Sequence, residues 1–103
     1  MSIYMTARFT VRPDRLDRAA LAIQEFVAYV AGHEPGTRLY TALQQVEEPT
    51  SFLHYFIFEN EAAMELHRTS PGVEKFTAAL YPDLEGEVEF TQWHLLASTA
   101  ELA

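Results

Sequence analysis

His67 is the residue of this 103-residue chain whose type and position most directly suggest catalysis. It falls near the end of an expected short helix, before a break at Ser70-Pro71, where its ring can reach a pocket between helix and sheet. An ordinary histidine pKa of about 6.5 lets the ring take a proton from a phenol or quinol near neutral pH, and the electron-rich anion that results reduces dioxygen readily. The alternative is a structural histidine bonded to a nearby carbonyl.

Four further residues are candidates for the same site. Tyr40 and Tyr55 come on neighbouring expected strands, and a phenol in an apolar pocket can hold a substrate carbonyl or a superoxide-like oxygen by hydrogen bonding. Trp93 can stack on a flat aromatic substrate and donate its indole N–H. Glu34 is held extended by Pro35, so its carboxylate can act as a second acid or base at the pocket mouth. The simpler interpretation is that the three aromatic residues pack in the core and that Glu34 lies in a solvated turn.

The other three histidines do not have the spacing of metal ligands: His33, His54 and His94 are scattered over an expected turn and two strands. The sequence also contains no His-Glu-x-x-His motif, no Gly-rich phosphate loop, no dinucleotide fingerprint and no Gly-x-Ser-x-Gly elbow. We therefore expect no metal and no organic cofactor. This agrees with an oxygenase whose substrate supplies the electrons.

Composition limits the class of protein further. Fifteen Asp and Glu against seven Lys and Arg give a net charge of −8, which disfavours nucleic acid as a partner. The absence of cysteine excludes disulfides and thiolate chemistry and fits the cytoplasm. No basic region followed by an apolar run and no stretch of roughly 20 apolar residues occurs, so we expect neither secretion nor membrane insertion. The length suits a single domain over residues 1–103.

Hydrophobic periodicity predicts alternating strands and helices. The expected strands are 3–11, 39–46, 52–58 and 88–96, and the expected helices are 14–31, a short one following Asn60, and 73–80. Asp14 and Asn60 are candidate N-caps. Gly32 is expected to close the first helix, and Gly36 is free to take a positive φ in the turn that follows.

This order of elements is the split βαβ pattern of α+β ferredoxin-like folds, in which both helices pack on one face of a four-stranded antiparallel sheet. The third strand is apolar on both sides, and the two sides are Leu53, Tyr55 and Ile57, and Phe52, Phe56 and Phe58. One chain has only enough helix to cover one side, so we expect a homodimer to cover the other. Arg8 projects onto that second face. Either it finds an acidic partner, with Glu89 as one candidate, or it lies at an edge in water.

Several short motifs together resemble the antibiotic biosynthesis monooxygenase family over residues 3–96. In order along the chain they are Val11-Arg12-Pro13-Asp14, Glu34-Pro35-Gly36-Thr37 followed by Tyr40, then Tyr55, and Glu61-Ala62-Ala63-Met64-Glu65-Leu66-His67 with Ser70 and Phe76. The resemblance implies a ferredoxin-like subunit, a dimeric α/β barrel, and a pocket in each subunit between sheet and helices. Members include cofactor-independent oxygenases of quinols or phenolic polyketide intermediates, and heme-degrading enzymes.

The chain departs from the heme-degrading branch, because Ala7, His67 and Thr77 stand where that branch has Asn, Trp and its proximal His. Phe56 also replaces an acidic residue that commonly follows the position of Tyr55. The favoured hypothesis is therefore a cofactor-independent monooxygenase that oxidises a small aromatic phenol or quinol with dioxygen. The alternative is a non-catalytic dimeric barrel that binds a small aromatic metabolite as an accessory or stress-response protein, which needs the same pocket but no base.

Overall fold

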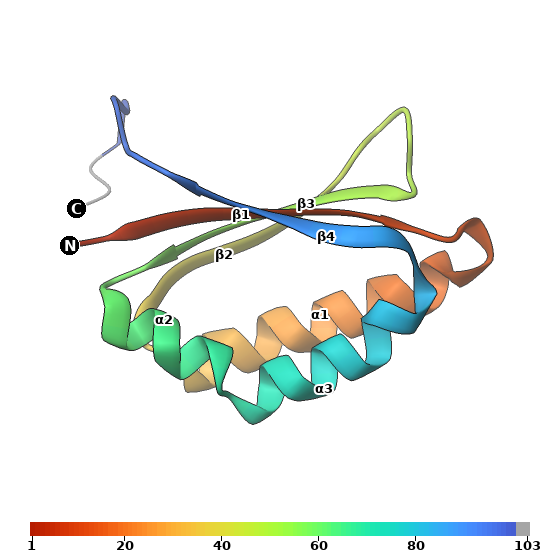
Figure 1. Cartoon of the computed structure of the whole chain (residues 1–103), viewed down its shortest axis with the longest axis horizontal. Helices are drawn as coiled ribbons and strands as arrows, with labels where there is room; N and C mark the ends of the chain where they lie inside the picture. The colour runs from red at the N-terminus through yellow and green to blue at the C-terminus, as the bar shows by residue number, and fades with distance from the viewer. Residues whose placement is uncertain (101–103) are drawn as a thin grey trace.

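In the computed structural model, which describes residues 1–100, a layer of helices covers one face of an antiparallel sheet (Figure 1). The strands are β1 (Ile3–Val11), β2 (Thr37–Gln44), β3 (Ser51–Phe58) and β4 (Leu84–Trp93), in the spatial order β2-β3-β1-β4. The helices are α1 (Leu16–His33), α2 (Glu61–Arg68) and α3 (Pro71–Leu80), with 3₁₀ turns η1 (Pro13–Arg15) and η2 (Tyr81–Asp83). This is the expected α+β ferredoxin-like fold. None of the described helices is both long and apolar enough to cross a membrane.

Strand alternation sends one set of side chains toward the helices. On β3 these are Phe52, His54, Phe56 and Phe58, all at most 5% exposed. Helix α1 meets them with residues at helical spacing, Ala19, Ile23, Phe26 and Val30. Burial of each large apolar side chain contributes about 1.5–3 kcal/mol, which fixes which face of each element turns inward.

Several element boundaries differ from expectation; among them, β2 begins at Thr37 rather than 39 and α3 at Pro71 rather than 73. Strand β4 begins at Leu84 rather than at 88, because Gly86 takes a positive φ of 77° and a register shift between Arg8 and Thr10 lets the pairing continue. Strands β2 and β4 also end early, at Gln44 and Trp93.

The expected first helix cap is wrong. Asp14 lies within η1 and makes no capping bond, and α1 begins at Leu16. Helix α1 also runs through Gly32 to His33, because Pro35 rather than Gly32 prevents its continuation. The Asn60 cap is confirmed, since the Asn60 side chain accepts a hydrogen bond from the Ala63 N–H at 2.9 Å.

Gly36 is needed for close packing and not for a positive φ, which among the described residues only Gly86 adopts. A Cβ at Gly36 would lie 2.6 Å from the Cβ of Ala63 on α2 and 3.4 Å from Glu59 Oε2. The absence of that atom lets α2 pack directly against the turn between α1 and β2. Glu34 lies in this turn, so the contact also brings α2 toward its carboxylate.

The opposite face of the sheet carries no helix (Figure 1). It presents a mixture of polar and apolar side chains, among them Leu43, Leu53, Tyr55 and Trp93. Arg8 lies opposite Glu89 in the β1–β4 pairing, but no ion pair joins the two within residues 1–100. We call this the open face.

Gly36→Ala should lower the free energy of unfolding by about 1–3 kcal/mol, because the new methyl group must push α2 away from the turn. Urea denaturation measures the change. Gly32→Ala is the matched control: nothing lies within 4 Å of its added Cβ, and alanine in a helix is favoured over glycine by roughly 0.5–1 kcal/mol. Equal destabilisation by the two variants would contradict the close-packing account.

Candidate active site

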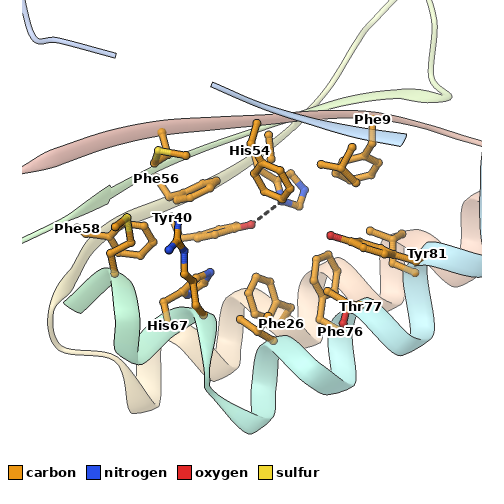
Figure 2. A pocket seen from close by; sticks show the side chains of 18 residues that line it. Phe9, Phe26, Tyr40, His54, Phe56, Phe58, His67, Phe76, Thr77 and Tyr81 are labelled. Atoms are coloured by element: carbon orange, nitrogen blue, oxygen red, sulfur yellow. Dashed lines mark hydrogen bonds between the residues drawn. The ribbon is translucent and has the colours of Figure 1, made fainter. Parts of the chain in front are cut away.

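A cavity of about 340 Å³ lies between the sheet and the helices. Its lining is mostly aromatic and aliphatic, and Figure 2 shows side chains from both layers pointing into it. The polar side chains in the lining are Tyr40, His54, His67, Arg68, Thr77 and Tyr81. A largely apolar cavity with a few converging polar groups is typical of a site for a small organic molecule.

His67 is held by the buried carboxylate of Glu34. Its Nδ1 lies 2.7 Å from Glu34 Oε1, which also accepts a hydrogen bond from the Thr37 hydroxyl at 2.8 Å. A carboxylate only accepts hydrogen bonds, so the Nδ1 of His67 carries the proton. In the neutral ring the other nitrogen, Nε2, is then unprotonated and available as a base.

Local sequence explains why these two residues meet. Glu34 directly follows α1 and is 3% exposed. The simpler alternative, a turn residue in water, is therefore wrong. His67 lies in the last turn of α2, whose start is fixed by the Asn60 cap. The His67 ring packs between Phe26 and Phe58, with ring centroids 5.7 and 5.1 Å away. These apolar walls keep water from the Glu34–His67 pair and strengthen its electrostatic interaction.

Tyr40 and His54 form a second buried pair, with the Tyr40 hydroxyl 2.7 Å from His54 Nδ1 (Figure 2). Burial lowers the pKa of His54 from 6.5 to about 4, so this ring is neutral at pH 7. Burial also raises the pKa of Tyr40 well above its ordinary value, and the negative charge of Glu34, with that of Tyr81 once it ionises at high pH, raises it further. Tyr40 therefore keeps its proton.

The structure brings His67, Glu34 and Tyr40 together, with the rings of His67 and Tyr40 6.0 Å apart. It does not bring Tyr55 or Trp93 to them. The strand register pairs Tyr40 with Phe56, so Tyr55 points to the open face, opposite Thr41.

Trp93 lies on the open face as well. It is 55% exposed, and its indole N–H donates to the Thr6 hydroxyl at 2.8 Å. Sharing a sheet with Tyr40 is thus not enough to share its cavity, because alternate residues face opposite ways. The prediction that Tyr55 and Trp93 share a pocket with Tyr40 is therefore wrong within this chain.

His54 and Tyr81 line the cavity, although the sequence did not predict them as site residues. His54 alternates in step with Phe52 and Phe56 along β3, so its side chain points to the helix side of the sheet. The alternation of the sequence is enough to predict this. Tyr81 was expected in a loop, where no periodicity indicates direction, and it lies in η2 at the cavity. Within residues 1–100, no group of three or more His, Asp or Glu side chains could hold a metal ion.

A family model described as antibiotic biosynthesis monooxygenase matches residues 2–79. The chain belongs to the antibiotic biosynthesis monooxygenase family. No curated protein sequence matches it. The family assignment agrees with the motifs singled out from the sequence.

Solved structures of similar fold include three bacterial proteins. A protein from Bacteroides thetaiotaomicron, assigned by inference as an antibiotic biosynthesis monooxygenase, has a TM-score of 0.89 at 20% identity, over 99% of this chain and 96% of that one. Rv0793 from Mycobacterium tuberculosis has a TM-score of 0.86 at 20% identity, over 97% and 100%. SnoaB, a cofactor-independent oxygenase from Streptomyces nogalater, has a TM-score of 0.83 at 18% identity, over 97% and 98%. At these identities the likeness shows the shared fold.

The buried neutral His54 should make folding stability depend on pH. Below about pH 6.5 the unfolded chain takes up a proton on this ring that the folded chain does not bind until about pH 4. Stability is therefore lost as the pH falls through this window, by about 2 kcal/mol between pH 7.5 and pH 5. Urea denaturation at the two pH values should show this loss in the native sequence and its absence in His54→Gln.

His33→Gln is the control, because the His33 ring is exposed and bonds only to the Tyr29 carbonyl at 3.0 Å. It should keep the full loss of stability. The account is contradicted if His54→Gln loses as much stability on acidification as His33→Gln.

Proposed function

We propose that this protein is a cofactor-independent monooxygenase that oxidises a small aromatic phenol or quinol with dioxygen. The observation that carries the proposal is the Glu34–His67 hydrogen bond of 2.7 Å at the edge of an aromatic cavity. A histidine fixed through Nδ1 by a carboxylate presents Nε2 as an oriented general base. A cavity that only bound an aromatic molecule would not need this arrangement.

The reaction balances with dioxygen as the sole oxidant. His67 removes the hydroxyl proton, and the resulting anion gives electrons to dioxygen while a carbon–oxygen bond forms on the ring. The oxygen–oxygen bond then breaks, so that one oxygen stays on the ring as a carbonyl and the other leaves as water. The substrate becomes a quinone through loss of four electrons, and dioxygen gains those four.

The lining of the cavity suits both reactants. Flat aromatic walls, with Phe26 and Phe76 stacked at 4.3 Å and Tyr40 and Phe56 stacked at 4.9 Å, favour a planar ring. Dioxygen is apolar and partitions into such surroundings. Exclusion of water protects the reactive intermediate from side reactions.

His67→Ala should lower kcat/KM by roughly 10²- to 10⁴-fold, because the general base is lost. Glu34→Gln should lower it by about 10- to 100-fold, because the His67 ring loses its orienting carboxylate. Oxygen consumption against a panel of quinols and phenols measures both effects, and the active substrate should give one quinone per dioxygen.

His33→Ala serves as the control, since His33 lies at the end of α1 and does not line the cavity. It should retain full activity. Unchanged oxygen uptake in His67→Ala, with an active native protein, would refute the assignment of the base.

A cytoplasmic homodimer without metal or organic cofactor is the form in which we expect the protein to act. Support comes from the open face, where Leu43 is 50% exposed and Trp93 55% exposed on a sheet without covering helices. A second copy packed across this face would bury these groups together with Leu53 and Tyr55. The two sheets would then form the α/β barrel that the family resemblance implies.

Leu43→Glu should shift the protein from dimer to monomer at micromolar concentration, because it places a charge in the proposed interface. Leu21→Glu is a matched control, since Leu21 is 58% exposed on α1, on the helix side of the molecule. Sedimentation should give twice the 11.7 kDa chain mass for the native protein and for Leu21→Glu. A native species of 11.7 kDa would overturn the dimer.

A further inference from the structure

The proposed reaction uses the Glu34–His67 pair and gives no role to three polar aromatic residues of the cavity, Tyr40, His54 and Tyr81. Figure 2 shows His67 on one side of the cavity and Tyr81 on the other, with the Tyr81 hydroxyl directed inward toward the Tyr40–His54 pair. Tyr81 also raises the pKa of Tyr40, because phenolate charges at the two positions would repel each other, and this agrees with hydroxyls that lie near one another. We call these three residues the hydroxyl cluster. The Tyr40 ring stacks on His67, but its hydroxyl points away from that ring toward His54 (Figure 2).

The unpartnered nitrogen of His54 indicates how the Tyr40–His54 pair shares its protons. His54 Nε2 is buried and has no hydrogen-bond partner within the described residues. A buried N–H without an acceptor is rarer than a buried lone pair without a donor, so the favoured tautomer carries its proton on Nδ1. That proton is donated to the Tyr40 oxygen at 2.7 Å. The Tyr40 O–H is then free to point into the cavity.

Tyr81 is the second donor of the cluster, and its backbone is fixed. It begins η2, which ends at Asp83, a buried carboxylate within 3.6 Å of three arginines. They are Arg12, Arg15 and Arg18, at 3.5, 3.6 and 3.4 Å. Burial raises the pKa of Tyr81, so its hydroxyl stays protonated near neutral pH. Two O–H donors therefore approach the same part of the cavity from opposite walls.

We infer that the Tyr40 and Tyr81 hydroxyls bind a second oxygen of the substrate, a carbonyl conjugated through the ring to the hydroxyl that His67 deprotonates, and that His54 positions Tyr40 for this. The inference deepens the proposed function and rests on it. When the proton leaves at the His67 end, negative charge spreads through the ring to the distant carbonyl oxygen. Two O–H donors placed there stabilise the charge as it develops.

The tyrosines keep their protons throughout, and no bond to the substrate forms or breaks at the hydroxyl cluster. In this scheme His54 makes its hydrogen bond to Tyr40 and none to the substrate, so it is a positioning residue. A hydrogen bond donated to the Tyr40 oxygen polarises its O–H and makes it a stronger donor. The cavity volume of about 340 Å³ leaves room for more than one ring, since a cavity of about 150 Å³ already holds benzene.

A matched pair of fused-ring probes tests the inference by binding alone. 6-Acetyl-2-naphthol carries the conjugated carbonyl, and 6-ethyl-2-naphthol has nearly the same shape without it. Fluorescence titration gives Kd for each probe in the native protein and in three variants. Tyr81→Phe and Tyr40→Phe should each weaken binding of the acetyl probe by roughly 3- to 10-fold, and binding of the ethyl probe by less than twofold.

The positioning role of His54 is tested by the ratio of the two Kd values, which a purely structural role would leave unchanged. His54→Phe should reduce the preference for the acetyl probe as Tyr40→Phe does, and combining the two should cause no further reduction. His54→Gln should restore part of the preference, because its amide can donate to the Tyr40 oxygen. Tyr81→Phe, at a partly exposed residue, keeps the test decisive if a buried variant fails to fold.

An unchanged ratio of the two Kd values in Tyr40→Phe and Tyr81→Phe would overturn the inference, as would failure of the native protein to bind either probe. The proposed function would still stand if oxygen uptake depended on His67. Conversely, a carbonyl preference that depends on both tyrosines, in a protein without oxygen uptake on any substrate, would support the hydroxyl cluster and refute the monooxygenase proposal.

Discussion

The burial of the Glu34 carboxylate is the constraint on which the rest of the site depends. A carboxylate that is 3% exposed is costly to remove from water unless hydrogen bonds compensate it. Here His67 Nδ1 and the Thr37 hydroxyl both bind Oε1, and Oε2 has no hydrogen bond within residues 1–100, so these two contacts carry the whole compensation. The end of α1, the start of β2 and the end of α2 must therefore stay together, and Gly36 makes that approach possible. One requirement thus links local backbone packing to the orientation of the proposed base.

The two faces of the sheet carry different groups and serve different functions. The helix-facing side holds the aromatic cavity, with one pair of groups suited to accept a proton and a hydroxyl cluster suited to donate hydrogen bonds. The open face holds the half-buried Tyr55 and the exposed Trp93, and the apolar surface of Trp93 favours contact with a second chain. Separation of these tasks follows from strand alternation, since neighbouring residues such as Tyr55 and Phe56 necessarily point opposite ways.

Much of the fold could be predicted because hydrophobic periodicity is strong in β1, α1 and β3. The site was harder. His67 could be selected from its residue type and helix position, but the burial of Glu34 depends on a contact between residues 33 positions apart. Tyr55 was wrongly predicted to share a pocket with Tyr40, because the sequence does not give the register between β2 and β3, which decides whether the two side chains lie on the same face. The direction of the Tyr81 side chain could not be predicted, because a short 3₁₀ turn has no hydrophobic periodicity.

The tautomer of His67 tests the central claim most directly. Long-range ¹H–¹⁵N correlation spectra of the native protein at pH 8, with His67→Gln to assign the signal, distinguish the two ring nitrogens. We predict a neutral ring with its proton on Nδ1, facing Glu34, and an unprotonated Nε2. A proton on Nε2 instead would mean that the carboxylate does not hold the ring as a base, and would contradict the account.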